Sequence, residues 1–449
     1  MSTNTLTDAV YLFKSVYQDN ELMEQFAENT TTRQIFKNTG SQWLSKLGAG
    51  QGNTSNSPAA WGLVWPIEDV RNNSVGAYSF SNPTLNPPTI RQGAQAYMAL
   101  MASSLGVVFD SILFTAANDD EKAFENVVKR NITTTNTDFE NYESRVMWSN
   151  GNGVLGVVGA VNTGTGVITL TQSSTQSFYP LTLFISPGQY VTILSPTGTD
   201  RTMDGILVSA ISRTNGTITL PTGGGIGNVQ AGDVIVGNQS WVAGQSAGQE
   251  PIGLTGQFGN TNNLFNVNTT THSSWVPASI TTNNTDPTTS FVEQMRMYIV
   301  NGGAKPNCII THPFVVSKYA LALETYKRYN DTTKIEGGVQ SYEKAQKPEG
   351  PEYPGIGPMY SDNNTPMGVQ ANTFCMYMGD TKSVFLGESD PIHWMDQDES
   401  MFKFIVGSAS ITTPSIAQYV GYLEHHWQFG CFRRISNALA TNVNALLVA

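Results

Sequence analysis

The chain has 449 residues, of which 39% are hydrophobic and only 13% are charged, and its formal net charge is -11. These apolar residues suffice to bury a core, which excludes a globally disordered chain, and this length predicts two or three packed units. The acidic balance argues against a reader of nucleic-acid sequence, which needs clustered cations to neutralise phosphates. The low charge favours surfaces that other protein covers, although an exposed, uncharged β-protein such as an adhesin has a similar composition.

The cysteines and the N-terminus indicate the compartment. Cys308, Cys375 and Cys431 lie far apart without the spacing of a metal or redox motif, so we expect reduced thiols in the core. Met1–Asn4 does not begin a basic segment followed by an apolar run, and no stretch approaches the roughly 20 apolar residues of a membrane helix. The sequence predicts a soluble protein made in a cytoplasm.

The first 60 residues are predicted to form an arm. Residues 5–28 carry apolar side chains at helical spacing, and a second short segment follows at 35–47. Residues 48–60 are rich in Gly, Ser and Asn, which predicts a flexible linker.

Residues 61–92 are predicted to be an extended, hairpin-like segment with few charges and several large aromatic side chains. Exposed alone, such a segment promotes aggregation, whereas against a neighbouring subunit it binds. Aromatic residues and Arg dominate interface energetics, so the candidate subunit-interface residues are Trp61, Trp65, Tyr78, Phe80 and Arg91. The alternative is a hydrophobic cluster inside the subunit's own core.

Helical and β patterns alternate after residue 93. Residues 94–116 are apolar and predict a mixture of helix and strand, and Asn118 with Glu121 then forms a capping box that predicts a helix. Residues 151–245 lose the helical pattern and alternate Gly, Val, Thr and Ile between turn signals. Within this stretch residues 158–170 resemble residues 208–220 without gaps, which predicts two similar hairpins in one small barrel or sandwich.

The last 200 residues return to a mixed pattern. Asp286-Pro287 is predicted to open a helix that stops at Gly302-Gly303. Residues 307–310 predict a buried strand that leads through Thr311-His312-Pro313 into another helix. Residues 330–358 predict a long mobile loop, and residues 367–439 predict mostly strand.

Motifs of enzymes lack their required context. Gly151, Gly153 and Gly156 match a dinucleotide-binding pattern, but a predicted helix precedes them and strands follow, which is the reverse of that motif. The five histidines do not have metal-ligand spacing, and the adjacent His425 and His426 point to opposite faces if they lie on a strand. We therefore predict no enzyme, no catalytic residues, no cofactor and no metal site.

The order of these parts resembles the Hong Kong 97-type fold of tailed-phage major capsid proteins. The segments that carry the resemblance are residues 150–158, residues 308–313 and residues 432–438. It implies an α+β fold with the following parts: an N-terminal arm (1–60), an E-loop (61–92), part of a P-domain with a spine helix (93–152), an inserted β-barrel or sandwich domain (153–242), and the remaining P-domain with the A-domain (243–449).

The function that the resemblance implies is mechanical. Identical subunits are expected to form hexamers and pentamers that close into an icosahedral phage head around double-stranded DNA, which is packaged without sequence specificity. The implied partners are a portal, a separate scaffolding protein and a decoration protein, with assembly in the host bacterial cytoplasm and no membrane. Some relatives cross-link through an E-loop lysine, but residues 50–95 contain no Lys. We therefore expect shells without covalent cross-links.

Two alternatives remain open on the sequence. An encapsulin-like compartment shares the fold but stores enzymes, and such proteins are usually compact without a large β insert. A β-rich surface adhesin or carbohydrate-binding module would instead use residues 153–242 as its binding unit. The missing signal peptide and the capped helices disfavour this second alternative.

Overall fold

A computed structural model of the chain describes residues 31–40, 62–70, 92–110, 121–173, 176–202, 205–223, 226–237, 250–259, 263–327, 352–353, 356–395, 403–406 and 417–446. The chain divides into two compact units, and each contains segments that are distant in sequence. One unit comprises Met1–Gln34, Met101–Pro251 and Glu388–Trp427, and the other comprises Ile35–Leu100, Ile252–Gly387 and Gln428–Ala449. Three elements have residues in both units: α2 (Thr31–Gly40), β16 (Val384–Trp394) and β18 (Ala417–Cys431).

The second unit is built on a mixed sheet of six strands in the order β11-β19-β15-β12-β14-β13. Its central strands are buried along their whole length, which explains why they read as continuous apolar runs without alternation. The strands are β11 (Ala278–Thr285), β12 (Cys308–Thr311), β13 (Glu352–Tyr353), β14 (Gly357–Ser361), β15 (Thr373–Gly379) and β19 (Asn437–Asn444).

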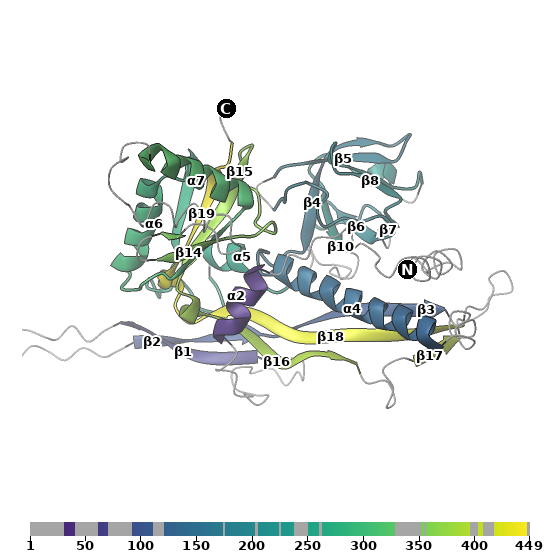
Figure 1. The fold of residues 1–449 in the computed structure, drawn as a ribbon, viewed down its shortest axis with the longest axis horizontal. Helices are drawn as coiled ribbons and strands as arrows, with labels where there is room; N and C mark the ends of the chain where they lie inside the picture. Colours follow the sequence, from purple (N-terminus) through teal and green to yellow (C-terminus); the bar gives the residue numbers. More distant parts are fainter. Residues whose placement is uncertain are drawn as a thin grey trace, which may run out of the picture. The chain divides into compact units, whose positions relative to one another are not determined.

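Two helices pack on this sheet (Figure 1). α6 (Thr289–Asn301) contacts β11 and β19, and α7 (Pro313–Lys327) contacts β14. Phe291, Met295 and Ile299 of α6 enter the core, whereas Tyr298 is 50% exposed. Shorter helices of this unit are α5 (Leu254–Phe258), η3 (Thr381–Ser383) and η4 (Arg434–Ser436).

An antiparallel ribbon of two strands, β1 (Gly62–Val70) and β2 (Gln92–Ala99), also belongs to this unit. Alternate β1 residues Leu63, Trp65 and Ile67 are buried, as the two-residue period of a strand requires. Their cross-strand partners are Met98, Ala96 and Ala94. The ribbon therefore has one apolar face, and this face packs within its own unit.

The first unit contains the long helix α4 (Glu121–Val146) and a four-stranded sheet with β3 (Met101–Asp110), β16, β17 (Lys403–Val406) and β18. β3 and β18 pair antiparallel over the whole of β3. Within α4 the Thr137 hydroxyl donates to the Thr133 carbonyl, because threonine in a helix can bond the preceding turn. Of residues 94–116, predicted as a mixture of helix and strand, 94–99 and 101–110 are thus strand, whereas 111–116 lie outside the described residues.

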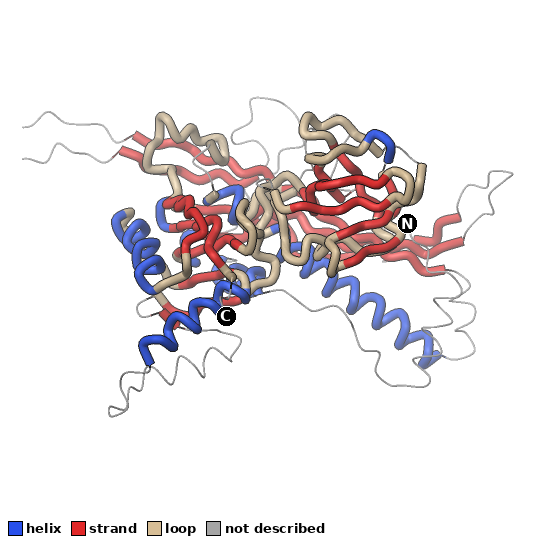
Figure 2. The backbone as a smooth tube through the Cα atoms, turned by 90° about the horizontal axis from the view of Figure 1, so that it is seen from above, coloured by secondary structure: helices blue, strands red, loops and turns tan. Residues whose placement is uncertain are grey.

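Residues 154–237 form a seven-stranded sheet in the order β7-β6-β10-β4-β5-β9-β8. The strands are β4 (Val154–Asn162), β5 (Val167–Thr171), β6 (Tyr190–Leu194), β7 (Ile206–Leu207), β8 (Ala210–Ser212), β9 (Thr217–Thr219) and β10 (Val234–Gly237). Only the single turn η1 (Ile226–Asn228) is helical among the described residues of this region (Figure 2).

This sheet closes into a small barrel because its two edge strands are consecutive in the chain. β7 and β8 are separated by Val208 and Ser209 alone. The Val208 amide donates to the Gln189 carbonyl on one side, and the Ser209 amide donates to the Thr219 carbonyl on the other, each at 2.9 Å. The single stretch 206–212 therefore joins both ends of the sheet around one apolar interior.

The sequence repeat appears in the barrel as an approximate two-fold symmetry. The Leu170 amide donates to the Gly216 carbonyl at 2.9 Å, and the Leu220 amide donates to the Gly166 carbonyl at 2.8 Å. The two bonds are equivalent in the repeat, because Leu170 corresponds to Leu220 and Gly166 corresponds to Gly216. The same holds for strand pairing, since β5 pairs with β9 at Ile168 and Ile218. The repeat is therefore a duplicated unit whose halves pair with each other.

Several elements begin or end at other residues than the sequence predicted. The predicted helices after residues 118 and 286 exist as α4 and α6, but the cap of α6 is Thr288, whose hydroxyl accepts from the Phe291 amide at 3.2 Å. Asp286 instead bonds Lys318 at 2.7 Å. The predicted helix at 5–28 and most of the predicted loop at 330–358 lie outside the described residues, although part of β14 falls within 330–358.

Candidate functional site

The predicted interface residues fall mostly outside the described part of the chain. Trp61, Tyr78, Phe80 and Arg91 lie there, and only Trp65 can be placed. Its indole is 8% exposed and makes edge contacts with the rings of three residues of the same unit: Phe265 at 5.6 Å, Phe385 at 5.5 Å and Phe432 at 6.1 Å. This is the environment that the own-core alternative predicts, and an interface role for Trp65 stays a prediction.

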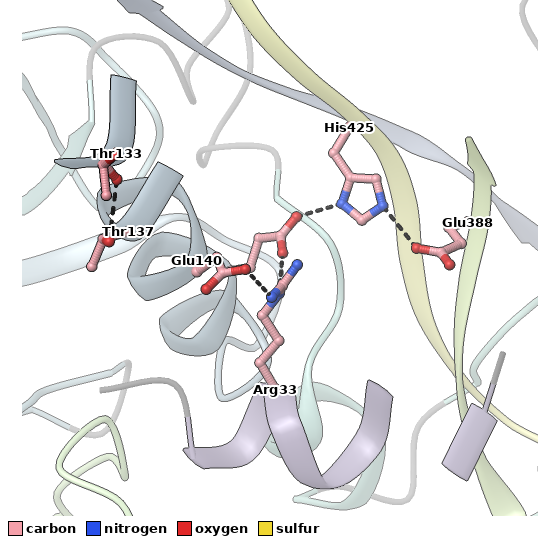
Figure 3. Close-up of polar contacts among 7 residues, drawn as sticks. Arg33, Thr133, Thr137, Glu140, Glu388 and His425 are labelled. Atoms are coloured by element: carbon pink, nitrogen blue, oxygen red, sulfur yellow. Dashed lines mark hydrogen bonds and ion pairs between the residues drawn. The ribbon is translucent and has the colours of Figure 1, made fainter. Parts of the chain in front are cut away.

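A buried ionic cluster in the first unit joins three distant parts of the chain. Arg33 of α2 donates to Glu143 of α4 at 2.5 Å and to Glu140 at 2.7 Å. Glu140 and Glu143 are three residues apart, so they project from the same face of the helix (Figure 3). Arg33 and Glu143 are buried, whereas Glu140 is partly exposed. One guanidinium thus contacts two carboxylates on α4 and offsets only part of their charge.

His425 of β18 extends this cluster. Its Nδ1 contacts Glu143 and its Nε2 lies 3.1 Å from Glu388 of β16, so both ring nitrogens face carboxylates (Figure 3). Burial opposes the charged ring, but the hydrogen bonds to the two carboxylates outweigh it and raise the pKa of His425 above 6.5. The neighbouring His426 is partly exposed and pairs with Glu424 at 2.7 Å. The adjacent histidines therefore point to opposite faces, as the sequence predicted for a strand.

A second buried ion pair lies where the barrel region begins and ends. Arg145 near the end of α4 donates to Glu250 at 2.5 Å, and the Glu250 amide donates to the Gly151 carbonyl at 3.3 Å. The Arg145 guanidinium also lies 5.1 Å from the ring centroid of Tyr142 and 5.7 Å from that of Phe184, within the range of cation–π attraction. These contacts hold together the two chain segments that flank residues 154–237.

Burial and the charge of Glu250 raise the pKa of Tyr142 well above its usual value, so this phenol stays neutral. The pKa of Arg145 is also raised, because Glu250 and Tyr142 outweigh the opposing effect of burial. Arg145 therefore stays positively charged beside the buried Glu250 carboxylate. We interpret the pair as one that stabilises the fold.

Two of the three segments that carried the family resemblance, residues 308–313 and 432–438, have structural roles within the second unit. His312 accepts the Phe314 amide at 3.3 Å on Nδ1 and so caps α7, as the sequence predicted, and burial lowers its pKa to about 4. Arg434 donates to the Gln257 carbonyl at 2.7 Å and to the Trp275 carbonyl at 3.1 Å. Arg433 donates to the Gly302 carbonyl at 2.8 Å, at the end of α6.

The three thiols are buried as expected, and burial raises the pKa of each to about 12. Such thiols stay protonated and are poor nucleophiles. Within the described ranges, no group of three or more His, Cys, Asp or Glu side chains could hold a metal ion. The described helices also include none that is both long and apolar enough to cross a membrane.

Sequence reasoning did not find the ionic cluster. Arg33, Glu143 and His425 are separated by more than 100 residues, and single charged residues at such distances carry no spacing signal. The sequence did contain one signal for the cluster. Two adjacent histidines on a strand point to opposite faces, so one ring is buried and needs a polar partner.

Comparison with known proteins gives structural similarity alone. No family model and no curated protein matches the chain. The cyanophage A-1(L) capsid asymmetric unit is 11% identical, with a TM-score of 0.48 and coverage of 95% of this chain and 96% of that one. The capsid of Myoviridae phage XM1 is 7% identical, with a TM-score of 0.42 and coverage of 94% and 95%.

The holo-SrpI encapsulin complex from Synechococcus elongatus PCC 7942 is 8% identical, with a TM-score of 0.37 and coverage of 86% and 84%. Two of these three solved structures are thus phage capsids, and the third is an encapsulin.

Proposed function

We propose that this chain is the major capsid protein of a tailed phage, a structural subunit that assembles into an icosahedral head around double-stranded DNA. The observation that carries the proposal is the order of parts along the chain. The ribbon β1–β2 comes first, then the 26-residue helix α4, then the barrel of residues 154–237, and last the mixed sheet with α6 and α7. This is the order of E-loop, spine helix, insert and A-domain that the resemblance implies.

The ribbon supports an E-loop assignment. β1 and β2 pair over nearly their full lengths, and 21 residues separate Val70 from Gln92. A ribbon that is anchored at its base by Trp65 and its aromatic neighbours can present the segment between its strands to another subunit. Under this proposal the buried side of the ribbon belongs to the subunit's own core, and the interface residues are sought among the predicted candidates Trp61, Trp65, Tyr78, Phe80 and Arg91.

The surface of α6 supports a shell subunit as well. Met297 and Tyr298 are each about half exposed on a helix whose opposite face is buried. Exposed large apolar side chains are a feature of surfaces that bind other protein. Together with a charged fraction of 13%, they suit a subunit that makes many contacts with copies of itself.

The proposal assigns the barrel to an inserted all-β domain at about residues 153–242. Its two ends are held by Arg145 and Glu250, and its interior is a separate apolar cluster. A unit that has its own core can be inserted without altering the fold that surrounds it.

The proposed function is tested by sedimentation of the full-length protein, produced alone and together with the products of its neighbouring genes. Assembly into particles of uniform, megadalton size supports a shell subunit, because closed symmetry fixes the copy number. Nuclease-protected DNA inside particles from the native source would distinguish a phage head from an enzyme compartment. A chain that sediments as a monomer under all of these conditions contradicts the proposal.

A further inference from the structure

The contacts of His425 require one more proton than a neutral ring carries. A neutral imidazole has a single N–H, so it can donate to one carboxylate and must turn a lone pair toward the other. His425 faces Glu143 on Nδ1 and Glu388 on Nε2. The arrangement is therefore satisfied when the ring carries both protons and donates to both carboxylates.

The charged groups around the ring favour this extra proton. Glu143 faces it from α4 and Glu388 from β16, while Arg33 of α2 acts on it through Glu143. Glu140 lies beyond Arg33. On the β3 side the residue that pairs with His425 is the uncharged Ser103. These three carboxylates outnumber the one guanidinium, so a protonated ring reduces the excess of negative charge, and it does so beside the buried Glu143.

The two carboxylates differ in what they can do when that proton leaves. Glu143 is fully buried and is held by Arg33, so it cannot turn to water. The Glu388 side chain is 27% exposed, so it can turn toward solvent. The contact between Nε2 and Glu388 is therefore the one that opens.

We propose that His425 is a proton-dependent latch that ties β18 to α4 and β16 while its ring is doubly protonated, and that loss of one proton releases Glu388. The raised pKa of His425 sets the direction of the effect. A group whose folded pKa lies above its unfolded value stabilises the fold below the unfolded pKa, and this contribution is lost as the pH rises through the folded pKa. Acidification through the raised pKa of His425 thus closes the latch, and alkali opens it.

The latch is tested by following the histidine ring signals of the full-length, unassembled protein by NMR from pH 5 to pH 9. The comparison uses Glu388→Gln, which removes one anionic acceptor at a partly exposed position where the fold tolerates it. Glu424→Gln is the matched control, because it removes the partner of the partly exposed His426 on the same strand. We expect Glu388→Gln to lower the proton affinity of His425 by about tenfold, and Glu424→Gln to leave it unchanged.

A second measurement follows the hydrogen exchange of β16, the strand that carries Glu388. Hydrogen exchange of amides near Glu388, corrected for the intrinsic effect of pH, should accelerate above the titration of His425 in the wild-type protein. In Glu388→Gln this pH dependence should be absent, because the amide side chain stays neutral throughout. The proposal is overturned if His425 titrates at or below pH 6.5 in the wild-type protein, or if the corrected exchange near Glu388 does not change with pH.

Discussion

Ile168 of β5 lies directly opposite Ile218 of β9, and the two isoleucines occupy the same position in the two halves of the sequence repeat. Both side chains are fully buried in the interior of the barrel. The pair lies at the approximate two-fold axis, so the two halves of residues 154–237 share one core. Neither half can bury its apolar face without the other.

Equivalent truncations of this pair should have equivalent effects. We expect Ile168→Ala and Ile218→Ala each to lower the free energy of unfolding of the barrel by about 2–5 kcal/mol, because each leaves a cavity in the same core. Since the residues are paired neighbours, the double variant should depart from the sum of the single effects. Calorimetry of the barrel transition measures this, with Ile168→Val as a mild control at about 0.5–1.5 kcal/mol. A negligible cost for one of the two alanines would contradict a shared core.

Two glycines at equivalent positions of the repeat provide an internal comparison. Gly166 and Gly216 both have positive φ angles, of 72° and 59°. A Cβ at Gly166 would lie 2.0 Å from the Leu220 carbonyl oxygen, whereas a Cβ at Gly216 would lie 3.4 Å from a Leu181 methyl group. We expect Gly216→Ala to cost about 1–2 kcal/mol from backbone strain alone, and Gly166→Ala to cost clearly more. Thermal unfolding of the two variants decides this, and equal costs would contradict the backbone clash.

The ion pair of Arg145 and Glu250 should be sensitive to loss of one partner. Arg145→Met leaves Glu250 buried without its counter-ion, and we expect a loss of about 3–5 kcal/mol. The double variant Arg145→Met/Glu250→Gln should recover part of this loss, because the remaining buried charge is gone. Urea unfolding of the single and double variants measures the coupling. If the double variant is as unstable as Arg145→Met, the ion pair does not hold together the segments that flank residues 154–237.

The exposed face of α6 should matter for assembly and little for folding. Tyr298→Asp changes an exposed side chain, so we expect a change in the free energy of unfolding of the subunit within about 0.5 kcal/mol. Under the proposed function it should lower the yield of closed particles, because it places a charge on an apolar contact. Gln294→Asp, at an exposed polar position of the same helix, is the matched control. If Tyr298→Asp gives the same particle yield as the wild-type protein, this face of α6 is not part of the subunit interface.

Particles of this protein should be held together without covalent bonds. Residues 50–95 contain no lysine that could attack an amide side chain of a neighbour. Boiling in detergent should therefore reduce particles to a single band at the chain mass of 48.6 kDa. A ladder of multiples of this mass on a denaturing gel would show cross-linking chemistry that the sequence does not predict.

Local patterns allowed much of the fold to be predicted. The helix predicted after residue 118, the pairing of residues 158–170 with 208–220, and the opposite orientations of His425 and His426 are all present in the structure. The contact of Glu143 with His425 could not be predicted from the sequence, because the two residues are 282 positions apart and lie on different elements, a helix and a strand. On α6, Ile299 is buried with Phe291 and Met295 whereas Tyr298 is exposed, and the sequence could not decide between them because residues three and four positions after Met295 both lie near the same helix face.

The central claim is that this chain builds a closed shell, and electron microscopy of particles purified from the native source tests it most directly. We predict closed icosahedral particles of uniform diameter that contain DNA and in which this chain is the main component. Particles without DNA that enclose other proteins would favour the compartment alternative. A chain that remains monomeric in the presence of its neighbouring gene products would contradict the capsid function altogether.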